Sequence, residues 1–216
     1  MRFVDRADAG RRLAQALLSY RDREPVVLAL PRGGLPVAAE IAAALAAPLD
    51  VVLARKIGAP GQPELALGAL VEGEPPTVAR NEAVISAARV DERAFAAATQ
   101  RARAELEDAR RRFIGDRPRV AIASRAAILV DDGVATGATA RAALQAIRRR
   151  GATTLTLAVP VASREALADL RGEVDDLVCL AAPAHFDAVS TFYVDFRQVE
   201  DDEAIAILAR SFPTAP

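Results

Sequence analysis

The 216-residue chain contains no tryptophan, one cysteine, one histidine and one methionine, and aromatic residues make up 4% of it. The single cysteine, Cys179, excludes an internal disulfide and a zinc cluster built on cysteines. The single histidine, His185, has no serine or cysteine partner in a recognisable motif, so neither a catalytic triad nor a histidine metal site is indicated. No lysine follows a Gly-X-X-X-X-Gly pattern, which makes a generic nucleotide-binding fold or a phosphoesterase a weaker interpretation.

The chain also lacks a large net charge and a long hydrophobic run. Its formal net charge of −1 at pH 7 gives no electrostatic reason to expect nucleic acid or a membrane surface as a partner. Hydrophobic residues make up 52%, but no apolar run approaches the roughly 20 residues that span a bilayer. Residues 1–6 carry closely spaced charges and no apolar segment of a signal peptide. We therefore expect a soluble, cytoplasmic protein.

What the chain does contain is a regular alternation of strand-like and helix-like patterns. Apolar and β-branched runs predict strands, and apolar residues at spacings of three and four predict helices. The strands are expected over residues 26–30, 49–54, 65–72, 120–123, 128–130, 153–161 and 174–181, and the helices over 8–20, 35–46, 140–150, 163–171 and 201–210. This order predicts an α/β fold with a Rossmann-like parallel sheet flanked by helices.

Residues 76–118 interrupt this alternation. A long helical pattern covers residues 90–114, and we interpret the segment as a helical insertion or hood beside the sheet of a single domain over residues 1–216. Three consecutive arginines, at residues 110–112, lie near the end of that helix. Acidic residues are interleaved with basic ones along it, so a solvated face is favoured over contact with nucleic acid.

Two adjacent carboxylates, Asp131 and Asp132, follow directly after the apolar run at residues 128–130. The carboxyl end of a parallel strand is where ligands bind in open α/β sheets. Two carboxylates cannot face one phosphate without repulsion, so sugar hydroxyls, a divalent cation, or both are the partners that suit them. The alternative is a generic strand and turn whose carboxylates are merely solvated.

The loop after the carboxylates is built of small residues and leads into a helix. Glycine and alanine let backbone N–H groups approach an anion, and the positive end of the helix dipole adds to the attraction. Thr136 and Thr139 can donate hydroxyl hydrogen bonds to the same anion. Carboxylates followed by such a loop predict a sugar-phosphate site.

A second turn, at residues 31–34, holds the same position after an earlier strand. Arg32 followed by Gly33 and Gly34 can present a guanidinium and backbone N–H groups to a further phosphate. Taken alone, a plain turn between strand and helix explains these residues equally well.

Residues 130–139 resemble the signature of the type I phosphoribosyltransferases, which use 5-phosphoribosyl-1-pyrophosphate (PRPP). The resemblance implies that Asp131 and Asp132 contact the ribose 2′ and 3′ hydroxyls, and that the turn at Arg32, Gly33 and Gly34 binds pyrophosphate. It further implies that the rest of the signature forms the PRPP-binding loop: Gly133, Val134, Ala135, Thr136, Gly137, Ala138 and Thr139. The 5′-phosphate would lie on the last five of these residues, from Ala135 to Thr139. Gly133 stands where the family usually has an apolar residue, and we expect it to loosen the turn.

Arg55 and Lys56 follow the expected strand at residues 49–54, and Lys56 is the only lysine among 28 basic residues. If PRPP is the substrate, these two cations can stabilise the departing pyrophosphate. Residues 57–64 are rich in glycine and proline and are expected to form a mobile cover over the site. Glu64 has three possible roles: contact with the nucleophile, placement of a metal ion, or capping of the loop.

The implied reaction transfers the 5-phosphoribosyl group to a nitrogenous base or related amine. Mg²⁺ is the expected cofactor, held indirectly by Asp131 and Asp132 through PRPP or water. Residues 30–34, 55–58 and 192–196 also resemble a bacterial branch of this family, but this likeness does not identify the acceptor. The alternative is a regulatory module of the same fold that senses PRPP or a nucleotide without turnover. Relatives of this fold often form homodimers.

Overall fold

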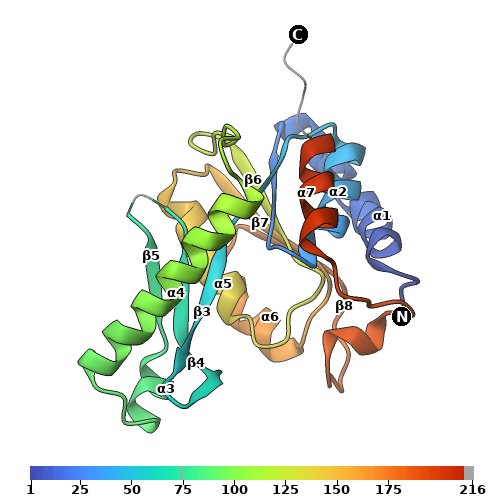
Figure 1. Ribbon diagram of the computed structural model, residues 1–216. Helices are drawn as coiled ribbons and strands as arrows, with labels where there is room; N and C mark the ends of the chain where they lie inside the picture. Colours follow the sequence, from blue (N-terminus) through green and yellow to red (C-terminus); the bar gives the residue numbers. More distant parts are fainter. Residues whose placement is uncertain (74, 212–216) are drawn as a thin grey trace.

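The computed structural model describes residues 1–73 and 75–211. Its centre is a five-stranded parallel sheet (Figure 1). Each neighbouring pair of strands is parallel, as predicted for an α/β fold. The strand order across the sheet is β2 (Leu49–Val51), β1 (Val26–Ala29), β6 (Ala126–Val130), β7 (Thr154–Val161) and β8 (Asp176–Ala181). This confirms the predicted fold class.

Helices cover both faces of this sheet, because its strands are apolar on both sides. Side chains alternate along a strand, so Val27 packs towards one group of helices and Leu28 towards the other. The first group consists of α1 (Arg6–Ala16), α2 (Gly34–Leu45) and α7 (Asp201–Arg210). The second group consists of α5 (Ala138–Arg149) and α6 (Arg164–Leu170). No helix in the described ranges is both long and apolar enough to cross a lipid bilayer.

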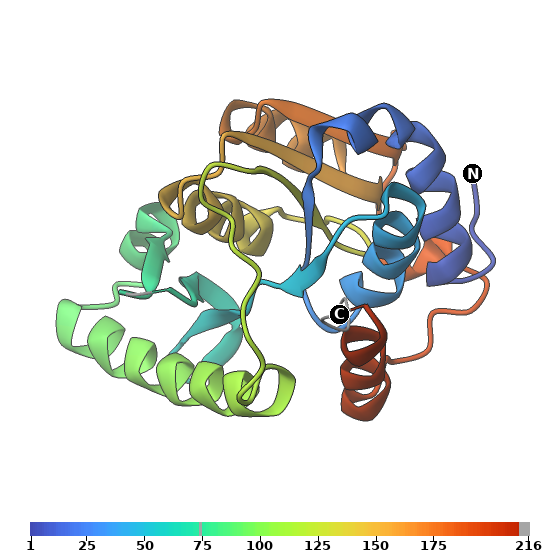
Figure 2. The same cartoon turned by 90° about the horizontal axis from the view of Figure 1, so that it is seen from above.

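Residues 54–113 form a second, antiparallel unit beside the central sheet (Figure 2). Its strands are β3 (Ala54–Ala59), β4 (Gln62–Val71) and β5 (Thr77–Arg80), and its helices are α3 (Glu82–Ala87) and α4 (Glu92–Phe113). The buried residues of α4 are spaced by three and four positions, from Phe95 to Phe113, and they pack against β3 and β4. The segment expected as a helical insertion, residues 76–118, thus contains α3 and α4 but also β5, which was not expected. Its helices pack on an antiparallel sheet of which only β4 was expected, at residues 65–72.

The predicted cover over residues 57–64 is a hairpin rather than a loop. Strand β3 continues to Ala59, β4 begins at Gln62, and Gly61 supports the turn with a φ of +71°. The register shifts on both sides of Gly58, which accommodates a glycine within the strand. Glycine and proline indicated the turn correctly, but β3 and the first residues of β4 were not expected as strands. The rest of β4 agrees with the strand expected over residues 65–72.

Three further boundaries differ from prediction. The first helix ends at Ala16 and continues as a 3₁₀ helix, η1 (Leu18–Arg23). Strand β2 ends at Val51, after which the chain crosses to the second unit. The strand expected at residues 120–123 is irregular, since the backbone N–H of Val120 donates to the side chain of Asp50 (3.0 Å) instead of joining a sheet.

Asp50 is fully buried in β2 and is the centre of an ionic network. Its carboxylate accepts hydrogen bonds from Arg117 Nη2 (3.0 Å), Arg119 Nε (2.8 Å) and the N–H of Val51 (2.8 Å). The network ties the segment between α4 and β6 to the edge of the central sheet.

Asp50→Asn should lower the free energy of unfolding by about 3 kcal/mol, because a neutral amide cannot balance the charges of Arg117 and Arg119 in a buried place as the carboxylate does. Urea denaturation followed by circular dichroism measures this loss. The matched control is Asp116→Asn, at an exposed position of the same segment, which should change stability by less than about 0.5 kcal/mol. Equal midpoints for the two variants would contradict a stabilising role for the network.

Candidate functional site

The two turns singled out in the sequence lie side by side at the carboxyl edge of the central sheet. Strands β1 and β6 are neighbours, with Ala29 opposite Val130, and the N–H of Leu30 donates to the carbonyl of Val130 (2.9 Å). The turn at residues 31–34 leaves the end of β1, and the signature loop leaves the end of β6. Parallel pairing thus joins two motifs that are about a hundred residues apart in the sequence.

The two glycines of the first turn rest directly on the acidic pair. A β-carbon on Gly33 would overlap the carboxylate of Asp132, and one on Gly34 would lie 2.8 Å from the carbonyl oxygen of Val130 and 3.1 Å from Asp131 Cα. Only glycine allows this approach of backbone to carboxylate. The peptide bond between Pro31 and Arg32 in the same turn is cis.

The carboxylates of Asp131 and Asp132 are held in a confined place. Burial raises the pKa of Asp131 well above its usual value, and the neighbouring charge of Asp132 acts in the same direction. Burial also raises the pKa of Asp132, although the guanidinium of Arg6 opposes this rise. Two crowded carboxylates of this kind favour a ligand that brings hydroxyl donors or positive charge.

Residues from the two ends of the chain hold Asp132 in position. Arg6 Nε donates to Asp132 Oδ2 (2.8 Å), and the Arg6 guanidinium lies 3.8 Å from the centroid of the Phe196 ring. The hydroxyl of Tyr193 donates to the carbonyl of Asp132 (2.5 Å), and burial raises the pKa of Tyr193. The backbone segments pair as well, since the N–H of Phe3 donates to the carbonyl of Phe192 (2.8 Å). Sequence reasoning missed Arg6, which no local pattern distinguishes from the other arginines.

The predicted phosphate loop is anchored at its base and open at its tip. The N–H of Val134 donates to the carbonyl of Val161 (2.9 Å), and Ser163 Oγ donates to the carbonyl of Ala135 (2.7 Å). Thr136 and Thr139 are exposed, and within the described part of the chain their hydroxyls have no hydrogen-bond partner. Two donors therefore remain available above the N-terminus of α5.

Two glycines shape this loop. Gly137 precedes α5 with a φ of +77°, a conformation that glycine adopts without strain. A β-carbon on Gly133 would lie 2.5 Å from Val189 Cγ1 and 3.1 Å from Val161 Cγ1. The expectation that Gly133 loosens the turn is therefore wrong, because the side chain of Val189 fills the space that a side chain at residue 133 would need.

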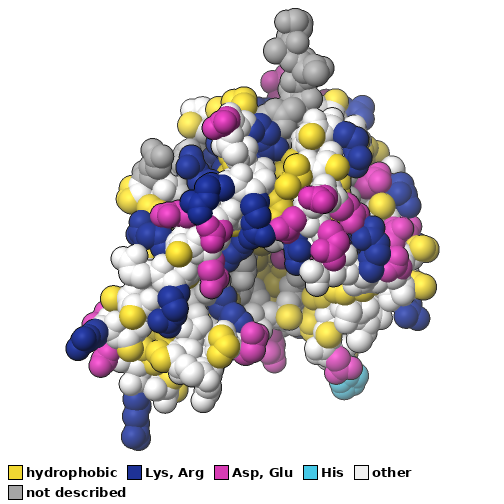
Figure 3. Space-filling view, viewed as in Figure 1, with side chains coloured by type: hydrophobic (Ala, Val, Ile, Leu, Met, Phe, Trp, Pro, Cys, Tyr) yellow, Lys and Arg dark blue, Asp and Glu magenta, His cyan; other side chains and the backbone are white. Residues whose placement is uncertain are grey.

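Beside the first turn is a cavity of about 300 Å³ between α4 and α7, in the hollow where basic and acidic side chains gather in Figure 3. Arg32, Arg55 and Arg112 line it together with one carboxylate, Asp201. Asp201 accepts from Arg32 Nη1 (3.1 Å) and Arg112 Nη1 (2.5 Å). Burial lowers the pKa of Arg55, and the nearby Arg112 and Arg32 contribute in the same direction. The cavity therefore favours an anion with more charge than one carboxylate.

Lys56 and Glu64 lie apart from this cavity. Lys56 Nζ and Glu64 Oε2 form an ion pair at 2.8 Å on the β3–β4 hairpin, and the Glu64 side chain is 94% exposed. The pair lines a neighbouring pocket between the hairpin and α4, which Arg55 also lines. The structure thus brings Arg32, Arg55 and the acidic pair to one edge of the sheet and leaves Lys56 and Glu64 at its rim.

Oxygen donors at the site suit Mg²⁺ only in combination with a ligand. Asp131 and Asp132 supply carboxylates, the ligand type that this ion prefers. In residues 1–73 and 75–211, however, no three His, Cys, Asp or Glu side chains gather as a metal site. Any further oxygens would have to come from a bound phosphate compound or water.

Comparison with known proteins identifies the family. The phosphoribosyl transferase domain family matches residues 4–197. Two curated Mycobacterium tuberculosis proteins, from strains CDC 1551 and H37Rv and each named "Putative phosphoribosyl transferase", are 46% identical over 209 residues, which is 97% of this chain. The chain spans about half of their length (47%). The crystal structure of TT1426 from Thermus thermophilus is 42% identical with a TM-score of 0.83, covering 98% of this chain and 99% of that one. As residues 130–139 predicted, the chain belongs to the phosphoribosyl transferase family.

Proposed function

We propose that this chain transfers the 5-phosphoribosyl group of PRPP to a nitrogen nucleophile and releases pyrophosphate. The observation that carries the proposal is the direct contact of the turn at Gly33 and Gly34 with the carboxylates of Asp131 and Asp132. It joins an anion-binding turn, a pair of hydroxyl acceptors and a phosphate loop along one sheet edge. These are the three sites that a sugar carrying phosphates at both ends requires.

Each part of PRPP has a matching part of this edge. The 5′-phosphate would lie on residues 135–139, where backbone N–H groups, two free hydroxyls and the start of α5 meet. The ribose hydroxyls would donate to Asp131 and Asp132. The pyrophosphate would enter the cavity lined by Arg32 and Arg55, where Arg112 adds a third guanidinium.

In the reaction, the bond between ribose C1 and the pyrophosphate oxygen breaks, and its electron pair leaves with pyrophosphate. A bond forms between C1 and the acceptor nitrogen, which then releases a proton to solvent. Arg32 and Arg55 stabilise the charge that builds on the leaving group, and the acidic pair orients the ribose and stabilises positive charge on its ring. Mg²⁺, when bound with PRPP, would neutralise part of the pyrophosphate charge. Lys56 and Glu64 would act from the hairpin at the rim.

A second candidate is a module that binds PRPP or a nucleotide as an effector without turnover. The Lys56–Glu64 pair favours it, because that lysine is neutralised outside the arginine cavity. A pyrophosphate-release assay with Mg²⁺, PRPP and a panel of bases and amines separates the two functions. Release with one acceptor establishes the transferase. PRPP binding without release across the panel supports the effector module.

Asp131→Asn should weaken PRPP binding by roughly tenfold or more, because a charged acceptor for a ribose hydroxyl is lost. Isothermal titration calorimetry in the presence of Mg²⁺ measures this change. Unchanged affinity would exclude the ribose contact.

The same variant should be more stable than the parent protein at pH 7. Because the pKa of Asp131 is raised in the folded state, the folded protein holds the proton of the Asp131 carboxyl group more tightly than the unfolded chain does. The contribution of the Asp131 carboxyl group to stability therefore falls as the pH rises above its pKa in the unfolded chain, about 3.9. Asn removes that loss, so the stability gain should be largest at neutral pH and disappear towards pH 3. Urea denaturation across this pH range measures the gain, and a gain independent of pH would contradict the assignment.

Asp201→Asn should raise the affinity for pyrophosphate by roughly threefold to tenfold, since the carboxylate that competes for Arg32 and Arg112 is removed. The matched control is Asp202→Asn, at the next and exposed position of the same helix turn, which should leave the affinity unchanged. Calorimetric titration of pyrophosphate into both variants measures the difference. An equal affinity in the two would show that Asp201 does not occupy the pyrophosphate site.

A further inference from the structure

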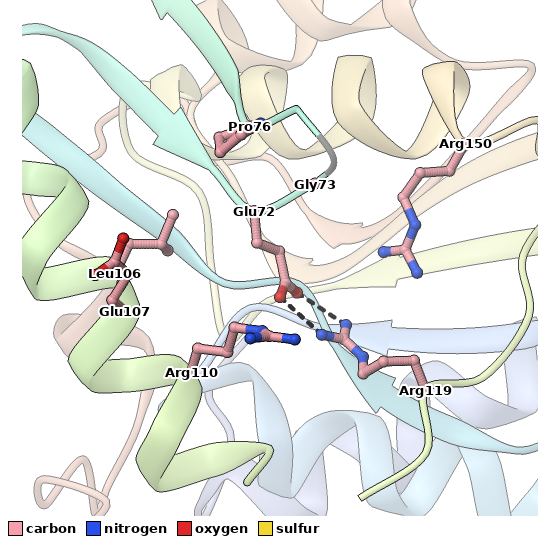
Figure 4. A pocket seen from close by; sticks show the side chains of 8 residues that line it. All are labelled: Glu72, Gly73, Pro76, Leu106, Glu107, Arg110, Arg119 and Arg150. Carbon is pink, nitrogen blue, oxygen red and sulfur yellow. Dashed lines mark hydrogen bonds and ion pairs between the residues drawn. The ribbon is translucent and has the colours of Figure 1, made fainter. Parts of the chain in front are cut away.

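A second group of arginines lies away from the carboxyl edge of the sheet. It surrounds a cavity of about 370 Å³ between α4, the end of β4 and the last turn of α5 (Figure 4). Helix α5 begins at the phosphate loop, and its 12 residues span on the order of 18 Å. The cavity is therefore at the opposite end of α5 from the proposed 5′-phosphate site.

The carboxylates nearest this cavity already have partners. Glu72 accepts from Arg119 Nη1 (2.7 Å) and Nη2 (2.8 Å), and from the N–H of Leu53 (3.0 Å). Arg119 also donates through Nε to the buried Asp50 (2.8 Å). These groups form a closed network that needs no additional cation.

Two further guanidiniums point at this network without an anion of their own. Arg110 comes from α4 and Arg150 follows α5, and Figure 4 shows both directed towards the Glu72–Arg119 pair. In the described residues, neither side chain has a hydrogen bond or an ion pair. Arg150 is partly buried, and burial lowers its pKa. The charge of Arg119 acts in the same direction, while the carboxylates of Glu72 and Asp50 oppose it without forming an ion pair with Arg150. Glu107, the other acidic residue of the lining, is exposed.

We propose that this cavity binds a small phosphorylated ligand, with its phosphate between Arg110 and Arg150. A guanidinium offers a fork of donors that matches phosphate oxygens, and a dianion would neutralise both unpaired charges. Leu106 and Pro76 line the same cavity and would contact the apolar part of the ligand. The volume lies within the range of cavities that hold small molecules. This site is independent of the proposed transferase reaction.

Arginine modification by phenylglyoxal, mapped by mass spectrometry, tests the site residue by residue. The probe is inorganic phosphate, compared with chloride at equal ionic strength. Phosphate should slow modification of Arg110 and Arg150 by at least about threefold and leave Arg93, an exposed arginine of the same helix, unchanged. Equal rates at Arg110 and Arg150 with and without phosphate, or equal slowing at Arg93, would overturn the proposal.

Arg110→Gln provides the second measurement. The residue is exposed and makes no ion pair in the described chain, so the variant should fold, as circular dichroism will verify. Protection of Arg150 should then require roughly tenfold more phosphate, because one charge-assisted contact is missing. If Arg150 is protected at the same phosphate concentration as in the parent protein, the two arginines do not share a ligand.

Discussion

The contact between the Gly33–Gly34 turn and the acidic pair is the constraint on which the rest of the site depends. It requires two parallel strands, β1 and β6, to end side by side, and it requires two positions without a β-carbon. Because backbone and carboxylate touch there, the two loops proposed to bind phosphate groups lie on either side of Asp131 and Asp132. A larger residue at position 33 would separate the parts of the site even if every strand kept its place.

Such a contact costs free energy, because it confines two carboxylates, and residues from both ends of the chain offset this cost. Burial disfavours the charged forms of both carboxylates and raises the pKa values of Asp131 and Asp132, and the charge of Asp132 adds to the rise at Asp131. Arg6 supplies a counter-charge and Tyr193 a hydrogen bond, and both are positioned by the pairing of the segment around Phe3 with residues 192–195. The acidic pair thus acquires its environment only when the first and last parts of the fold meet.

The sequence predicted the elements whose signals are local. Alternation of apolar runs and helical patterns was sufficient for the parallel sheet, and the order of carboxylates, small residues and helix at residues 130–139 was sufficient for the family. Prediction failed where the reason lies in another part of the chain. The hairpin around Gly61 resembles a loop until its two strands are paired, and Gly133 resembles a loose turn until Val189 is placed beside it. Arg6 could not be recognised because 27 of the 28 basic residues are arginines, so the identity of an arginine alone carries little information. Arg112 was noticed only as part of the cluster at residues 110–112, which was interpreted as a solvated face, and its place at the cavity depends on Asp201 from another part of the chain.

The charges of the proposed PRPP site are largely satisfied within the chain. Asp132 is paired with Arg6, Arg32 with Asp201, and Lys56 with Glu64. Ligand binding would therefore exchange internal ion pairs for ion pairs with the ligand. The electrostatic contribution to the binding free energy would be the difference between these two sets of ion pairs. Pyrophosphate carries several negative charges where Asp201 carries one, so the exchange favours the ligand among three converging guanidiniums. By the same argument, a ligand with a single carboxylate would gain little there. The internal pairs would thus give the cavity a preference for polyanions, in addition to the preference that its shape supplies.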